Sequence, residues 1–138
     1  MEEVIAVYEG EASATTLLLC MDEKPFQLLG DTVAPLAASV DGKPQRQPYA
    51  YERHGSCNIL CAVAPLVGKR WVKVTEQRTK RDYAEFMQEV SEQIRQEMPA
   101  VRLIDVVQDN LNTHTKGAFY ERFDSVTARA LSERFAFH

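Results

Sequence analysis

The chain has 138 residues, of which 45% are hydrophobic and 26% charged, and this composition predicts one compact domain rather than two domains or a disordered chain. The formal net charge of −4 argues against a protein that coats nucleic acid, but it is compatible with a nuclease site, which itself concentrates carboxylates. No apolar run reaches the roughly 18–20 residues of a membrane span, and the acidic N-terminus does not resemble a signal peptide. Three cysteines fit buried free thiols in a reducing compartment. We therefore expect a cytoplasmic protein with no membrane partner.

The first half of the chain predicts a short helix, two strands and a long loop between the strands. The helix is expected over residues 2–8. Residues 15–21 form a continuous apolar run, which predicts a central strand covered on both faces, and this strand is expected to stop at residues 22–25. Residues 30–55 are punctuated by Pro and Gly and predict a loop of a length that is usually functional or disordered. Residues 55–64 place apolar side chains at alternate positions, which predicts the second strand.

The second half predicts a hairpin, a long helix and further strands and helices. A turn at residues 65–68 leads into a strand over residues 69–76, and such a short connection makes an antiparallel pair. Thr79 and Asp82 form a variant of the capping box before an apolar stripe at helical spacing, and Pro99 ends that helix. The remaining expected elements are a strand over residues 101–108, helices over 115–123 and 126–134, and a strand over 135–138. The order predicts an α/β domain whose mixed sheet combines an antiparallel hairpin with parallel strands, flanked by helices.

Two of the predicted apolar strands end in acids, at Asp22 and at Asp109. The intervening helix allows the later strand to return by a right-handed crossover and to lie parallel beside the first. The two carboxylates would then meet at the carboxyl ends of neighbouring strands, where open α/β sheets place ligand sites. Carboxylates so close repel each other unless a cation lies between them, and Mg²⁺ prefers such oxygen ligands. The pattern predicts a metal site suited to phosphodiester cleavage.

Other interpretations of these acids are open. An acid directly after a buried strand is very often a solvated strand end or a helix cap. Asp105 shares the strand parity of Asp109, so it is either a third ligand or an edge position that faces water, and we favour the second. His114 is not expected to bind metal, because no cluster of His and Cys residues accompanies it.

Three segments go beyond this pattern: CMDEKPFQLLGD, WVKVTEQRTKRDYAEFM and VVQDNLNTHT. Together they resemble the catalytic domain of mariner-superfamily transposases of the bacterial insertion-sequence type, which belong to the DDE superfamily and have a ribonuclease H-like fold. The resemblance extends over nearly the whole chain. It implies that Asp22 and Asp109 are the catalytic acids that hold Mg²⁺, with Mn²⁺ as a substitute. The implied reaction is hydrolysis at transposon ends, followed by attack of the freed 3′-hydroxyl on target DNA.

The resemblance also implies features that the chain does not display. The family pattern requires a third acid on a helix after the last strand, whereas this sequence ends at His138, and Glu121 and Glu133 precede the expected position. The family's N-terminal helix-turn-helix is absent as well. We therefore expect residues 1–138 to form a single catalytic-core domain that is incomplete at the C-terminus, lacks the last catalytic helix and is inactive alone.

Two other functions are open at this stage. One is a non-enzymatic transposase remnant that persists as a folded binding or dimerisation module, which would form a homodimer through its open sheet edge. The other is a different Mg²⁺-dependent nuclease or phosphatase on the same fold. Titration with Mg²⁺ or Mn²⁺ separates both enzymatic interpretations from the remnant.

Candidate DNA contacts lie around the two acids and in a basic stretch. The resemblance implies that Asn112 and His114 shape the edge of the site or contact DNA, although loops and helix caps also require such residue types. Lys24 would either hold a phosphate or neutralise its acidic neighbours. Four further basic residues predict phosphate contact that weakens with salt, the alternative being a solvated charged surface. They are Lys73, Arg78, Lys80 and Arg81.

Overall fold

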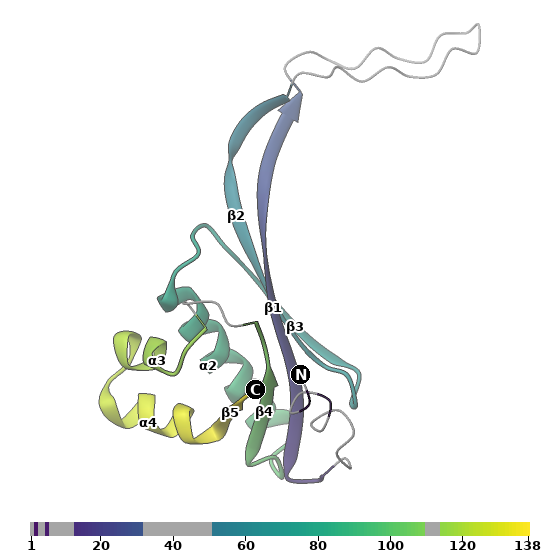
Figure 1. Ribbon diagram of the computed structural model, residues 1–138, viewed down its shortest axis with the longest axis vertical. Helices are drawn as coiled ribbons and strands as arrows, with labels where there is room; N and C mark the ends of the chain where they lie inside the picture. Colours follow the sequence, from purple (N-terminus) through teal and green to yellow (C-terminus); the bar gives the residue numbers. More distant parts are fainter. Residues whose placement is uncertain (1, 3–4, 6–12, 32–50, 110–113) are drawn as a thin grey trace, which may run out of the picture.

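The computed structural model describes residues 2, 5, 13–31, 51–109 and 114–138 (Figure 1). The expected helix over residues 2–8 lies largely outside the described residues. The labelled elements are β1 (Thr16–Asp31), β2 (Tyr51–Ala64), β3 (Lys69–Thr75), α2 (Lys80–Glu97), β4 (Leu103–Val107), α3 (Gly117–Arg122), α4 (Ser125–Arg134) and β5 (Phe135–Phe137). No helix in the described part of the chain is long and apolar enough to cross a membrane.

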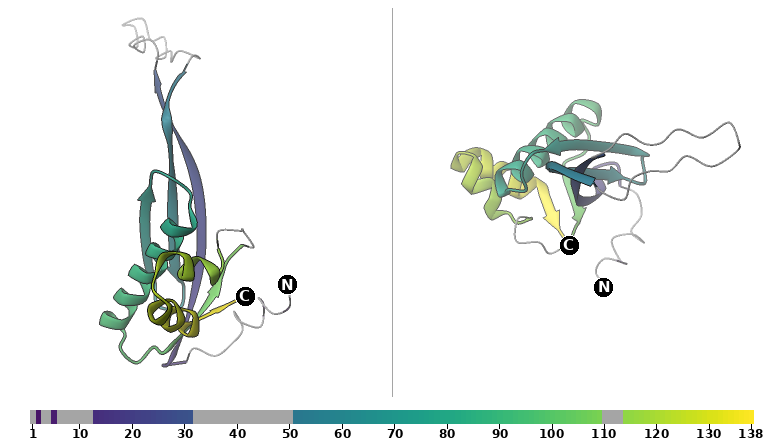
Figure 2. Two further views of the ribbon diagram at one scale, coloured as in Figure 1. Left: turned by 90° about the vertical axis from the view of Figure 1, so that its left-hand side faces the viewer. Right: turned by 90° about the horizontal axis from the view of Figure 1, so that it is seen from above.

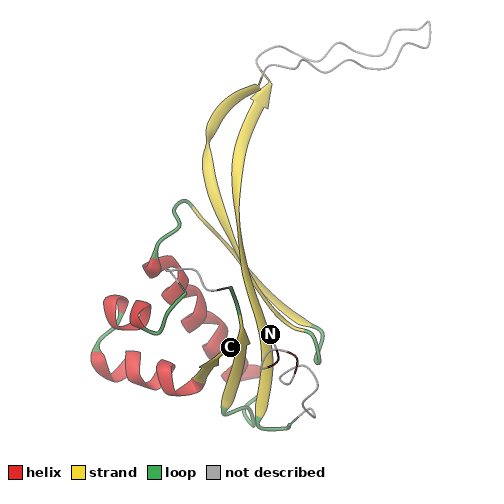
Figure 3. Ribbon diagram, in the orientation of Figure 1, coloured by secondary structure: helices red, strands yellow, loops and turns green. Residues whose placement is uncertain are grey.

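The strands form one mixed sheet in the order β3-β2-β1-β4-β5 (Figure 3). Strands β2 and β3 are antiparallel, which confirms the predicted hairpin. Strand β4 returns parallel to β1 and pairs with it directly, from Thr16 opposite Leu103 to Cys20 opposite Val107. The predicted crossover through the long helix is therefore confirmed, and the central position of β1 follows from it.

Strand β1 is much longer than the sequence indicates. It was expected to stop at residues 22–25, but it continues to Asp31 and is paired with β2 from Cys20 onward. Asp22 consequently lies in the middle of a strand rather than at its end. Beyond Cys20, β1 is no longer paired with β4 but is still paired with β2, so one edge of β1 is open at Pro25. Proline lacks a backbone N–H and is tolerated at such an open edge, because no hydrogen bond to a neighbouring strand is lost there.

Beyond the body of the domain, β1 and β2 continue as a two-stranded arm formed by residues 25–31 and 51–57 (Figure 1). A register shift between Gln27 and Leu29 marks a β-bulge, and Gly55 on the opposite strand has a φ of +111°, which favours glycine. Phe26 and Leu29 are 49% and 53% exposed. The arm is therefore held by its hydrogen-bond ladder and not by the core. Residues 32–50, within the predicted long loop, lie outside the described residues.

The core lies between the sheet and helices α2, α3 and α4, which cover the same face (Figure 2). Leu17, Leu18 and Leu19 are at most 5% exposed, which confirms a central strand buried on both faces. The largest fully buried side chains come from three elements that meet in the core. They are Tyr83 and Phe86 on α2, Phe119 on α3 and Phe135 on β5. The three cysteines form no disulfide with one another and are half-buried, not buried as the sequence suggested.

Helix α2 begins at the predicted capping box. The Thr79 hydroxyl accepts a hydrogen bond from the Asp82 backbone N–H at 3.2 Å, and the Asp82 carboxylate accepts one from the Thr79 N–H at 3.1 Å. We expect Thr79→Ala to lower the free energy of unfolding by about 1 kcal/mol, because the Asp82 backbone N–H loses its acceptor and the Asp82 carboxylate loses the hydroxyl that donates to it. Urea denaturation measures this loss. Thr79→Ser, which keeps the hydroxyl, is the matched control, and an equal loss in both variants would contradict the assignment.

Candidate active site

The register of β1 and β4 brings the two predicted acids to the same level of the sheet. The last bonded pair is Cys20 with Val107, and Asp22 and Asp109 each follow that pair by two residues. Asp22 is still paired on its other side, with Cys61 of β2. Asp109 follows β4 directly, where that strand has ended. The register thus brings the two acids to the same level of the sheet, with Asp22 in mid-strand and not at a strand end.

Both carboxylates are accessible, and both are already oriented by one hydrogen bond. The Asp22 side chain is exposed, and its Oδ1 accepts a hydrogen bond of 2.8 Å from the Glu23 backbone N–H. The Asp109 side chain is 49% exposed, and its Oδ1 lies 2.8 Å from Nδ1 of His114. Because an ionised carboxylate only accepts, Nδ1 donates in this contact.

Behind Asp109 lies a buried polar group that the sequence reasoning did not identify. Glu23 on β1 has a side chain only 2% exposed, and it forms an ion pair with Arg78. Its Oε2 accepts a hydrogen bond of 3.2 Å from Asn58 on β2 and lies 3.3 Å from Nε2 of His114. The sequence does carry one signal for the burial of Glu23. Side chains alternate along a strand, and this alternation places Glu23 on the same inward face as Leu19 and Met21.

The ring of His114 is fixed by aromatic and backbone contacts as well. It stacks on Tyr83 of α2, with ring centroids 4.7 Å apart. The Tyr83 hydroxyl donates to Gln108 Oε1 at 2.8 Å, and Gln108 Nε2 donates to the His114 carbonyl at 2.9 Å. Burial raises the pKa of Tyr83, so this hydroxyl remains a donor.

The donor chemistry at Asp22 and Asp109 fits a hard divalent cation, which takes oxygen ligands and completes its shell with water and phosphate oxygens. In the described part of the chain, however, no three His, Cys, Asp or Glu side chains converge closely enough to hold an ion. Asp105 does not join the pair: it lies on β4 and contacts His138 through a 3.2 Å interaction between Oδ1 and Nε2. The two acids are thus a partial ligand set.

The predicted DNA-binding residues are not equally available. Lys73 pairs with Glu89 at 2.6 Å and Lys80 with Glu121 at 3.0 Å, and Arg78 is committed to Glu23. Lys24 and Arg81 are exposed, and neither forms an ion pair with another described residue. His114 is buried, which favours a role behind Asp109 over direct contact with DNA. Asn112 lies outside the described residues.

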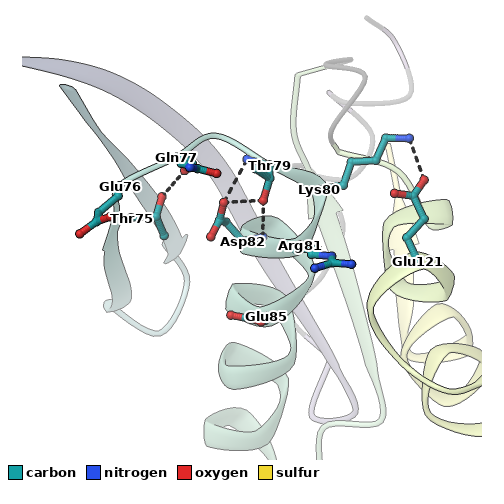
Figure 4. Close-up of a pocket in the computed structure, with 9 residues that line it drawn as sticks. All are labelled: Thr75, Glu76, Gln77, Thr79, Lys80, Arg81, Asp82, Glu85 and Glu121. Carbon is teal, nitrogen blue, oxygen red and sulfur yellow. Dashed lines mark hydrogen bonds and ion pairs between the residues drawn. The ribbon is translucent and has the colours of Figure 1, made fainter. Parts of the chain in front are cut away.

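The basic stretch borders a cleft of about 750 Å³ between the end of β3, the start of α2 and α3 (Figure 4). Lys80 and Arg81 line it together with four acids, namely Glu76, Asp82, Glu85 and Glu121. Asp82 is occupied by the capping box and Glu121 by Lys80 (Figure 4). The wall of this cleft is therefore of mixed charge.

Comparison with known families decides the assignment of the domain. The sequence profile described as "DDE superfamily endonuclease" matches residues 17–133, which include both acids and every labelled strand except β5. The chain belongs to this family. A search of curated proteins gives no match to this DDE domain.

Solved structures of a transposase share the architecture of the DDE domain. The pre-cleavage Mos1 transpososome has a TM-score of 0.56 and 11% identity over 99% of this chain and 39% of that chain. The Mos1 transposase paired-end complex with left transposon end has a TM-score of 0.58 and 13% identity over 99% and 38%. The Mos1 mariner paired end complex with Mn has a TM-score of 0.53 and 15% identity over 91% and 38%.

Identities of this size show the fold alone. The mixed sheet with helices is the ribonuclease H-like fold that the sequence predicted, and the DDE domain spans 38–39% of the length of these Mos1 chains. One of these Mos1 structures is a paired-end complex with the left transposon end, and another is a paired-end complex with Mn.

Proposed function

We propose that this DDE domain is the catalytic core of a DNA transposase of the bacterial insertion-sequence type, in which Asp22 and Asp109 hold Mg²⁺ or Mn²⁺. The observation that carries the proposal is the parallel β1–β4 register, which brings two accessible aspartates to the same level of neighbouring strands in a domain of the DDE family. Bound there, divalent cations supply activation of an attacking hydroxyl and stabilisation of the leaving oxygen in phosphodiester cleavage. The substrates are transposon ends and target DNA.

The two acids are held in place by different contacts. Asp22 stands on a strand bonded to β2 on one side, which keeps its backbone fixed. Asp109 stands at the end of β4, and His114 holds one of its oxygens. The third acid that the family resemblance implies does not come from a described residue near this pair.

The simplest test of the proposed metal site is a titration of the purified chain with Mn²⁺, with electron paramagnetic resonance as the measurement of bound ion. Saturable binding supports the proposal, and no binding contradicts it.

DNA contact is proposed to centre on Lys24. Strand alternation puts Lys24 on the same face of β1 as Asp22, two residues further along, and its side chain is exposed. A phosphate bound beside the two acids would lie within reach of this ammonium group. Arg81, on the first turn of α2, is the second exposed candidate.

We expect Lys24→Ala to weaken binding of double-stranded DNA uniformly across sequences and to lower the salt slope of log K by about 1, because one phosphate contact is lost. Fluorescence anisotropy at several salt concentrations measures both quantities. Arg102→Ala is the matched control, since Arg102 is equally exposed but precedes β4, at the end opposite Asp109. If both variants reduce the slope equally, DNA binding is not centred on the acids.

The homodimer and the cytoplasmic location expected from the sequence stay predictions. Light scattering of the purified chain over a range of concentrations tests the first of them. A dimer that binds no metal would favour the non-enzymatic module over the catalytic core.

A further inference from the structure

A buried carboxylate beside the active site requires an explanation. Glu23 occupies an inward position of β1, with a side chain 2% exposed, where the preceding inward residues Leu19 and Met21 belong to the core. Burying a charge is costly unless it is paired and hydrogen-bonded. Arg78 forms an ion pair with Glu23, and Asn58 donates a hydrogen bond to it. Three polar side chains therefore meet at this position of β1.

The remaining neighbour of Glu23 is His114, which connects it to Asp109. The two ring nitrogens face different carboxylates: Nδ1 lies 2.8 Å from Asp109 Oδ1, and Nε2 lies 3.3 Å from Glu23 Oε2. The second contact has the distance of an ion pair but not the alignment of a hydrogen bond. The His114 side chain is fully buried, and Tyr83 stacks against the ring. Its orientation is therefore fixed on three sides.

We propose that Glu23 and His114 act as positioning residues for Asp109. Glu23 is anchored on β1, the same strand that carries Asp22, and His114 transmits that anchor to the carboxylate at the end of β4. Through His114, β1 orients Asp109 as well as Asp22, even though Asp109 lies beyond the end of β4. His114 engages Asp109 through Oδ1, so Oδ2 is the oxygen that we assign to the cation. This inference rests on the proposed function, because it gives the metal-binding acid its orientation.

The same arrangement bears on His114 and Arg78, two of the residues predicted to contact DNA. Both side chains are turned toward Glu23, and His114 has no exposed atom to offer a phosphate. Outer partners of metal ligands typically change metal affinity by about 10- to 100-fold when they are removed. The position of His114 matches that class of residue.

Two substitutions of His114 separate positioning from packing. In His114→Asn the amide nitrogen takes the place of Nδ1 and can still donate to Asp109, although the contact with Glu23 is lost. In His114→Gln the amide lies near Nε2 and faces Glu23, so the contact with Asp109 is lost. Both variants lose the ring that stacks on Tyr83, so we expect equal losses of unfolding free energy in urea. We expect a decrease in Mn²⁺ affinity of about 10- to 100-fold for His114→Gln and a smaller decrease for His114→Asn. Equal Mn²⁺ affinities in the two variants would overturn the proposal.

A second measurement tests the contact between His114 and Asp109 in the absence of metal. In ¹⁵N spectra of the imidazole groups, wild-type His114 is expected to show a protonated Nδ1 whose hydrogen exchanges slowly with water. Asp109→Ala removes the acceptor and should abolish that signal. If wild type lacks the signal, or Asp109→Ala retains it, the positioning contact does not exist. If wild type shows the signal but binds no Mn²⁺, the proposed metal function fails while the contact stands, so the two failures are distinguishable.

Discussion

Replacing either Asp22 or Asp109 with Asn is expected to lower Mn²⁺ affinity by at least about 100-fold, because even the outer partners of metal ligands are worth about 10- to 100-fold. Each substitution removes one negative charge and one oxygen ligand from the proposed site, whose two acids the register brings to the same level of the sheet. Hard cations of this class depend on such carboxylates. Calorimetric titration or electron paramagnetic resonance gives the affinities directly.

The double variant, with both acids replaced, is expected to bind no more weakly than either single variant. Groups that act as one unit are non-additive, since removal of the first already abolishes the shared site. Asp105→Asn is the matched control, because Asp105 lies on β4 but contacts His138 instead. Unchanged affinity in Asp22→Asn or Asp109→Asn, or additive losses in the double variant, would show that the two acids do not share a cation.

The largest effect on stability is expected from Phe119→Ala, at about 3–5 kcal/mol. Phe119 is fully buried on α3, and its ring lies 6.3 Å from that of Tyr83 and 5.9 Å from that of Phe135. It therefore joins α2, α3 and β5 in one aromatic row, and that row continues to His114. A typical domain has only about 5–15 kcal/mol of stability in total, so this substitution leaves the fold marginal.

Urea denaturation of Phe119→Ala, with the milder Phe119→Leu as a second variant that is expected to remain folded, measures this contribution. Tyr120→Ala is the control, because Tyr120 is the next residue on the same helix and is 53% exposed. Its expected loss is below about 0.5 kcal/mol. Losses of similar size at both positions would mean that α3 does not pack against the sheet through Phe119.

The sequence was most informative where local pattern and tertiary environment agree. The apolar run before Asp22 predicted a strand buried on both faces, and Leu17, Leu18 and Leu19 have that environment. Thr79 and Asp82 predicted the start of α2, because a capping box involves only neighbouring residues. The parallel return of β4 followed from chain order and the handedness of crossovers.

The second half of β1 could not be predicted in this way. Residues 24–31 contain no core-facing stripe, and Pro25 normally indicates the end of a strand. What keeps this segment extended is β2, whose Ile59 is the partner of Lys24 across a separation of 35 residues. Such a ladder is decided by a distant segment and leaves little local signal.

The buried group behind Asp109 is likewise a tertiary feature. Strand parity placed Glu23 inside, but its partners Asn58, Arg78 and His114 come from three other segments. No local pattern favoured these partners over solvent. The two candidate acids could be found from the sequence because both follow apolar runs, whereas the residues that orient them could not.

A crystal structure of the chain grown with Mn²⁺, in which anomalous scattering locates the ion, tests directly whether Asp22 and Asp109 share a cation. We expect one peak within coordination distance of both Asp22 and Asp109, with Asp109 bound through Oδ2 while His114 keeps Oδ1. A peak bound to only one of the two acids, or a peak elsewhere with the pair empty, would contradict it.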